Sequence, residues 1–198
     1  MANHDPLRLD ASFERDARLH DGRPVRLRWI RAADADLLRE GFARLSQQSR
    51  RTRFFIPVRE LSDEMVRRMT QVDGYDHGAL VALSVPDAAS GERERGLGVA
   101  RFVRSLEDRS SAEIAVTVID EVQGLGLGHL LLSTIAVAAH ERGIETFTMD
   151  VLSENTRVKS MLWNLHADWK QREGDVSTYA VATARIEGAS LGGWPDAA

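Results

Sequence analysis

The sequence contains no cysteine among its 198 residues, which excludes disulfide bonds, thiolate catalysis and cysteine-bound metals. It also lacks a long apolar run. The longest, residues 130–139, includes Ser133 and Thr134 and is half of the roughly 20 residues that a membrane-spanning helix needs. Residues 1–20 have no hydrophobic segment behind a basic end, so we expect no secretory signal, no association with a membrane and a cytoplasmic location.

Excess positive charge is absent as well. The 26 Lys and Arg residues against 30 Asp and Glu residues leave a net charge of -4, which argues against a nucleic-acid partner. The six histidines show neither an i, i+4 pair nor the carboxylate spacing of a metal site, so we expect no metal. The remaining composition, 43% hydrophobic and 28% charged, is typical of a globular protein whose length fits a single domain.

The pattern of apolar residues predicts an α/β fold of mixed α+β character, a mixed central sheet flanked by helices. Alternation of apolar and basic residues at 25–29 is typical of a half-buried strand, and apolar spacings of three and four predict helices. The predicted order is β-αα-βββ-α-β-α-β. The predicted strands cover residues 25–29, 79–85, 98–103, 114–119, 146–152 and 176–186. The predicted helices cover residues 35–45, 61–69, 129–142 and 156–165.

We expect one domain over residues 23–186. Residues 1–22 mix charges without apolar periodicity and are predicted to form a flexible N-terminal arm. Residues 187–198 are predicted to form a C-terminal tail.

Three alternate glycines, Gly124, Gly126 and Gly128, lie between a predicted strand and a predicted helix. Such a loop can bend tightly and direct several backbone N–H groups at an anion, with the positive end of the helix dipole behind them. No Gly-Lys-Ser/Thr follows, so this is no Walker loop, and the dinucleotide fingerprint lacks its final glycine. The pattern predicts a pyrophosphate site, with a plain glycine turn that reverses the chain as the alternative.

The motif Gln123-x-x-Gly126-x-Gly128 resembles the Gln/Arg-x-x-Gly-x-Gly/Ala loop of the GNAT superfamily of acyl-CoA-dependent N-acyltransferases. The predicted order of elements over residues 23–185 is similar to that of the superfamily too. Within it, four stretches look like the Pat-type bacterial protein lysine acetyltransferases: Leu45-Ser46-x-x-Ser49-Arg50-x-x-Arg53-Phe54-Phe55, Leu61-Ser62-Asp63-Glu64, Thr70-Gln71-Val72-Asp73 and Ala112-Glu113-Ile114-Ala115.

The resemblance implies that acetyl-CoA is the cosubstrate. Backbone groups of the loop would bind its pyrophosphate, and the preceding strand would hydrogen-bond its pantetheine arm. Asn155, which would meet the arm from the other side, is equally consistent with a plain helix cap. The cofactor-binding residues implied are Val116, Thr117, Val118, Gln123, Gly124, Leu125, Gly126, Leu127, Gly128 and Asn155.

Glu113 is the candidate catalytic residue. It begins a strand on the same face as Ala115 and Thr117, whose small side chains leave room for a substrate. From Glu113 to Val118 is roughly 17 Å at about 3.3 Å a residue, comparable with an extended pantetheine arm. The resemblance to the GNAT superfamily implies that a glutamate at this position is the general base, usually acting through water. The alternative is a solvated glutamate at a strand end.

A base is needed because a lysine ammonium, with an ordinary pKa near 10.4, has no lone pair at neutral pH. The neutral amine would attack the thioester directly, with a backbone N–H near Val116 or Thr117 stabilising the oxyanion. Many GNAT members place a tyrosine acid seven residues after the asparagine, where this chain has Leu162. A thiolate with an ordinary thiol pKa near 8.5 leaves without strong acid help.

Other residues have two interpretations each. His77 could line the acceptor pocket or act as a second base, or belong to a polar turn. Arg50, Arg51 and Arg53 could recognise an acidic acceptor or the adenosine phosphate, or lie at a solvated helix end. The expected acceptor is a protein lysine, for instance on an acyl-CoA synthetase. The alternatives are a small-molecule amine N-acetyltransferase and a non-catalytic acyl-CoA-binding regulator.

Overall fold

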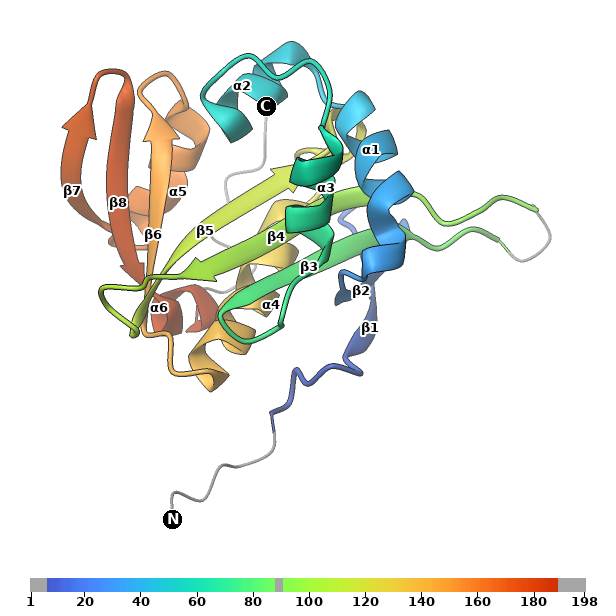
Figure 1. Ribbon diagram of the computed structural model, residues 1–198, viewed down its shortest axis with the longest axis horizontal. Coiled ribbons are helices and arrows are strands. Elements are labelled where there is room, and N and C mark those ends of the chain that lie inside the picture. Colours follow the sequence, from blue (N-terminus) through green and yellow to red (C-terminus); the bar gives the residue numbers. More distant parts are fainter. Residues whose placement is uncertain (1–6, 88–90, 189–198) are drawn as a thin grey trace.

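A computed structural model describes residues 7–87 and 91–188 of the chain (Figure 1). Its centre is one sheet with the strand order β1-β2-β3-β4-β5-β6-β8-β7. Neighbouring strands are antiparallel except β5 and β6, which run parallel. The strands are β1 (Glu14–Arg18), β2 (Pro24–Trp29), β3 (His77–Ser84), β4 (Gly96–Arg104), β5 (Ser111–Val118), β6 (Thr146–Leu152), β7 (Asp168–Glu173) and β8 (Val176–Ala182).

Helices cover both faces of the sheet, so the mixed α/β class predicted from the sequence is confirmed. The first three helices lie on one face, and α4 and α6 lie on the other (Figure 1). None of the helices in the described part of the chain is long and apolar enough to cross a membrane. The helices are α1 (Ala35–Ala43), α2 (Gln47–Phe54), α3 (Asp63–Thr70), α4 (Leu127–Glu141), α5 (Thr156–Asn164) and α6 (Thr183–Gly188), with 3₁₀ turns at Ala32–Asp34 and Asp120–Val122.

The hydrophobic core lies where helices cover both faces of this sheet. In β3, the six residues between its two ends are all buried, because both faces of the strand meet helices. Phe102 of β4 and Phe147 of β6 are fully buried and stack with ring centroids 6.5 Å apart. Leu131 and Ile135 of α4 are fully buried in the same core. The centre of the sheet is therefore closely packed against α4, and this packing positions β5 and α4.

The sheet begins earlier than predicted. Instead of starting at Arg23, it starts with β1, which pairs with β2 within the segment predicted to be an arm. Leu9 is buried, its carbonyl accepts a hydrogen bond from Arg142 Nη2 at 2.8 Å, and the Asp10 carbonyl accepts one from Trp29 Nε1 at 2.7 Å. These contacts join segments far apart in the sequence, so no local pattern could have shown them. Of the predicted tail over residues 187–198, residues 187–188 instead belong to α6, and the rest lies outside the described residues.

Three further elements were missed or misassigned. Helix α2 has no buried residue and three arginines, so it offers no apolar period; its only signal was Ser46, whose side chain accepts the Ser49 N–H as an N-cap. Strand β7 is exposed along its whole length. The strand predicted over 176–186 ends at Ala182, where α6 begins. In each case the structure depends on a neighbouring element, not on local apolar periodicity.

A buried ion pair connects the sheet to α1. Arg28 of β2 donates two hydrogen bonds to Asp34, at 2.7 and 2.8 Å, and the Arg31 backbone N–H donates a third at 2.7 Å. Burial alone would raise the pKa of Asp34, but these hydrogen bonds outweigh it and lower the pKa below its ordinary value. The stabilisation is therefore present above the ordinary aspartate pKa and is lost as the pH falls through the lower pKa of the folded state.

We expect Asp34→Ala to lower the free energy of unfolding by about 3–5 kcal/mol at pH 7, because it leaves the Arg28 charge buried without its partner. Asp16→Ala removes an exposed partner of Arg26 and should cost at most about 1 kcal/mol. Urea denaturation of the two variants beside the parent checks this. Equal losses in both variants would contradict a special role for the buried pair.

Candidate functional site

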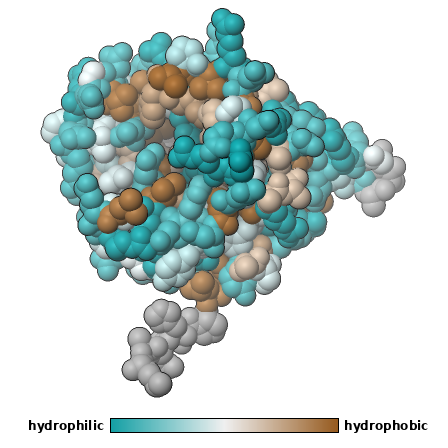
Figure 2. All heavy atoms as spheres, in the orientation of Figure 1, coloured by the Kyte–Doolittle hydropathy of each residue, from teal (hydrophilic) through white to brown (hydrophobic). Residues whose placement is uncertain are grey.

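A cleft of about 480 Å³ opens where β5 and β6 separate. The two strands pair only from Ser111 to Glu113 of β5, opposite Thr146 to Thr148 of β6, and then diverge. Beyond Glu113, β5 pairs with β4 alone, so its other edge presents unpaired backbone N–H and C=O groups to the cleft. Such an edge can accept an extended, amide-containing chain as an additional strand. Figure 2 shows apolar atoms in a hollow beside α2.

Most of the predicted site residues line this cleft. They are Glu113, Val116, Thr117, Val118, Gln123, Gly124, Gly126, Gly128 and Asn155. Leu125 and Leu127 do not line it: the Leu127 side chain is buried in the core, and the Leu125 carbonyl accepts a hydrogen bond from the His20 N–H at 3.1 Å. Alternate residues of the loop therefore face the cleft and the protein.

The glycine loop leads into a helix with no side-chain cap. Gly124 and Gly126 have φ angles of 80° and 84°, in the left-handed region that favours glycine. Gly126 is the N-cap of α4, and it leaves the first N–H groups of the helix without a side-chain acceptor. These N–H groups and the positive end of the helix dipole make an anion site, which fits a pyrophosphate.

The loop glycines differ in what surrounds them. A Cβ added at Gly126 would lie 2.6 Å from Nε2 of His20, in the hairpin between β1 and β2, so the His20 ring would have to move, and the φ of 84° strains any side chain at this position. A Cβ added at Gly128 would lie 3.8 Å from the nearest atom, a Val118 methyl, which is ordinary contact. Of these two glycines, only Gly128 can therefore be replaced without disturbing its surroundings.

Helix α2 covers one side of the cleft. Neither the helix nor its position was predicted from the sequence. Asp120 accepts hydrogen bonds from the Ser46 N–H and from the Ser46 and Ser49 hydroxyls, at 2.7 to 3.0 Å. Burial would raise the pKa of Asp120, but these bonds outweigh it and lower the pKa. Gln123 Nε2 donates to the Ser49 hydroxyl and to the Val118 carbonyl, both at 3.1 Å. The Gln123 side chain thus braces the loop against β5 and α2.

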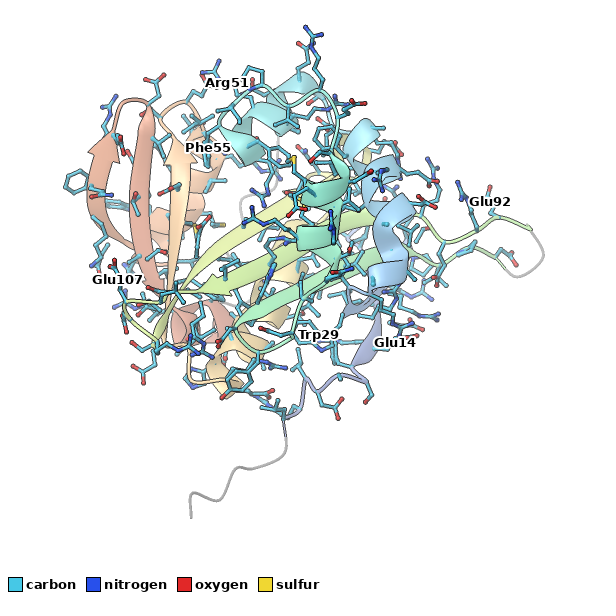
Figure 3. The ribbon with its side chains drawn as sticks, viewed as in Figure 1. Glu14, Trp29, Arg51, Phe55, Glu92 and Glu107 are labelled. Carbon is cyan, nitrogen blue, oxygen red and sulfur yellow. The ribbon has the colours of Figure 1, made fainter. Side chains whose placement is uncertain are left out.

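On its far side, α2 reaches the segment before α5. Gln48 Nε2 donates to Glu154 at 3.2 Å, and Arg51 forms an ion pair with Glu154 at 3.5 Å. Phe55, which follows α2 in a left-handed conformation, also lines the cleft; Figure 3 shows it and Arg51 at this end of the molecule. The side-chain oxygen of Asn155 accepts the Val158 N–H at 3.1 Å. Asn155 is therefore a helix cap that also lines the cleft.

Glu113 lies at the point where the two strands part. It is exposed, it pairs in register with Val103 of β4, and it lines the cleft. Arg53 of α2 has a pKa that is lowered by burial and partly restored by the attraction of Glu113. The Arg53 guanidinium carbon lies 5.1 Å from the centre of the Phe54 ring. The cleft thus contains an exposed carboxylate at one end and the glycine loop at the other.

The other candidates have structural partners. Arg50 donates to the carbonyls of Leu45, Arg59 and Ala43. His77 lies outside the lining of the cleft, with Nε2 2.9 Å from Nη1 of Arg101.

Burial and the neighbouring Arg101 charge lower the pKa of His77, which keeps the ring neutral at pH 7. Asp73 accepts the backbone N–H groups of Tyr75, Asp76 and His77, as in the polar turn that was the alternative interpretation. Leu162 is buried in the core. No group of three metal-ligating side chains occurs within residues 7–87 and 91–188.

No protein-family model matches the chain, but curated proteins are similar in sequence, among them two acetyltransferases. Acetyltransferase PA5475 from Pseudomonas aeruginosa is 34% identical over 125 residues, which are 63% of this chain and 64% of that protein. Acetyltransferase Pat from Mycolicibacterium smegmatis is 31% identical over 121 residues, which are 61% of this chain and 34% of that protein. The chain thus matches less than two thirds of either relative.

Solved structures share the fold. The GNAT domain of S. lividans PAT has a TM-score of 0.75 at 29% identity, covering 85% of this chain and 96% of that domain. Spermidine N-acetyltransferase from Vibrio cholerae, solved with CoA and spermine, has a TM-score of 0.62 at 12% identity, covering 82% and 97%, and shows the fold alone. The chain therefore has the GNAT fold. In sequence it is similar to the Pat-type acetyltransferases, as its motifs predicted.

Proposed function

We propose that the chain transfers an acetyl group from acetyl-CoA to a protein lysine, with Glu113 as the general base. The observation that carries this proposal is the cleft itself. It joins an uncapped helix N-terminus behind a glycine loop to an unpaired strand edge, and it has a carboxylate at its far end. The helix N-terminus suits a pyrophosphate, the strand edge suits an amide-containing arm, and the carboxylate suits an amine. The spermidine acetyltransferase of the same fold was solved with CoA, which supports this cosubstrate.

In the proposed reaction, acetyl-CoA supplies the thioester. Glu113, directly or through a water, accepts a proton from the lysine ammonium. The neutral amine then forms a bond to the thioester carbon, the carbon–sulfur bond breaks as the thiolate leaves, and the nitrogen gives up its second proton to the thiolate or to water. Backbone N–H groups at Val116 or Thr117 would donate to the oxyanion. The side chain at position 162 cannot protonate the thiolate, because Leu162 is an apolar residue buried in the core.

The resemblance to Pat-type enzymes supports a protein lysine as acceptor, with an acyl-CoA synthetase as a specific candidate partner. The exposed position of Glu113 at the end of the cleft also suits an acceptor presented by another protein, since that end is open to solvent.

We expect incubation with acetyl-CoA to acetylate lysines on such a synthetase at least tenfold above an enzyme-free control, as measured by mass spectrometry. Free amines tested in parallel should turn over slowly. Rapid acetylation of a free amine with no modified lysine would establish the small-molecule alternative. Binding of acetyl-CoA without any acetyl transfer would favour the alternative of a non-catalytic acyl-CoA-binding regulator.

A further inference from the structure

A second, smaller cavity of about 70 Å³ lies between α1–α3 and the strands β3–β5. Side chains such as Ile30, Leu38 and Phe42 give it an apolar lining. It shares Arg53, Ala115 and Thr117 with the cleft, so these three residues separate the two spaces. Ala115 and Thr117 lie on the same face of β5 as Glu113.

Small residues keep this cavity open. Gly41 lies within α1 and lines the cavity, and a Cβ added there would meet only the Gly96 carbonyl, at 4.0 Å. A glycine inside a helix is destabilising relative to alanine, and an unfilled apolar cavity is destabilising too. The chain thus has a glycine where a larger residue would fit and would stabilise the fold.

Charged residues at the cavity have their polar groups engaged elsewhere. Arg101 donates to the Met69 carbonyl and contacts His77 Nε2, and Asp34 is paired with Arg28. The Arg53 guanidinium lies against the Phe54 ring. Most of the lining is apolar, so the cavity suits an apolar group.

We propose that this cavity receives the tail of an acyl group of about four to six carbons, so that the chain uses short-chain acyl-CoA as well as acetyl-CoA. The inference rests on the proposed function, which places the thioester at the backbone of Val116 and Thr117. An acyl tail starting there meets Ala115 and Thr117, the residues shared with the cavity. A space of 70 Å³ has room for roughly five water-sized groups, which matches a few methylenes.

The test is calorimetric titration with acetyl-CoA and butyryl-CoA, which needs no acceptor. The parent protein should bind butyryl-CoA roughly tenfold more tightly, since each buried methylene is worth about fourfold. Gly41→Leu should fill the cavity and remove this preference, with acetyl-CoA affinity unchanged within about twofold. Ala43→Leu adds the same side chain at an exposed position of α1 and should keep the preference.

Equal affinities of the parent for the two compounds would overturn the inference while leaving the proposed function in place, as would a Gly41→Leu variant that keeps the preference. Absence of any acyl-CoA binding would overturn both. If circular dichroism shows that Gly41→Leu does not fold, the test uses the parent protein alone. Its affinity is then measured for a series of acyl-CoA compounds from acetyl-CoA to decanoyl-CoA. Affinity should rise to about six carbons and then stop rising or fall, whereas a flat series or a continuous rise would contradict a cavity of this size.

Discussion

Replacing Glu113 with glutamine is expected to lower turnover by roughly 10²–10⁴, the usual contribution of a general base, while acetyl-CoA affinity stays unchanged. The amide keeps the size of the side chain at an exposed position but cannot accept a proton. The loss should shrink as the pH approaches 10.4, because more of the lysine amine is then already neutral. Turnover measured against pH, together with calorimetric acetyl-CoA affinity, checks both parts.

Glu107→Gln is the matched control. Glu107, labelled in Figure 3, is an exposed glutamate in the turn between β4 and β5 and is not among the residues that line the cleft, so its replacement should leave turnover unchanged within about twofold. A Glu113→Gln variant as active as the parent at every pH would show that the base lies elsewhere. Loss of stability and acetyl-CoA affinity together, with an unchanged pH profile, would mean that Glu113 only supports the strand.

Placing a negative charge in the glycine loop should have the second large effect. Gly128→Asp is expected to weaken acetyl-CoA binding by at least about a hundredfold, because a carboxylate within about 5 Å of a pyrophosphate charge costs a few kcal/mol at an effective dielectric constant of 20. The space at Gly128 admits a Cβ without a clash. An acidic residue in the first turn of α4 interacts favourably with the helix dipole, so the melting temperature should stay level or rise.

Gly128→Asn separates charge from size, since asparagine has nearly the same shape as aspartate and no charge. We expect it to weaken binding much less than Gly128→Asp, and raised ionic strength should reduce the difference. Similar affinity losses in the two variants would indicate a steric effect. Unchanged affinity in both folded variants would rule out the loop as the pyrophosphate site.

Local sequence was sufficient for the parts of the site whose physics is local. A glycine loop needs only left-handed backbone at Gly124 and Gly126 and a helix start directly after it, and all of this lies within consecutive residues. The face shared by Glu113 and Thr117 follows from the two-residue period of a strand. These features could therefore be predicted before any fold was known.

Tertiary structure alone decided the rest, because it depends on contacts between distant segments. The separation of β5 from β6 after Glu113 opens the cleft, and no single stretch of sequence encodes where two strands stop pairing. The polar helix α2 is placed over the cleft by Asp120 and Glu154, more than 70 residues away. The cavity beside Gly41 exists only because α1 packs over β4, since an empty space is a property of packed elements and leaves no pattern in the sequence.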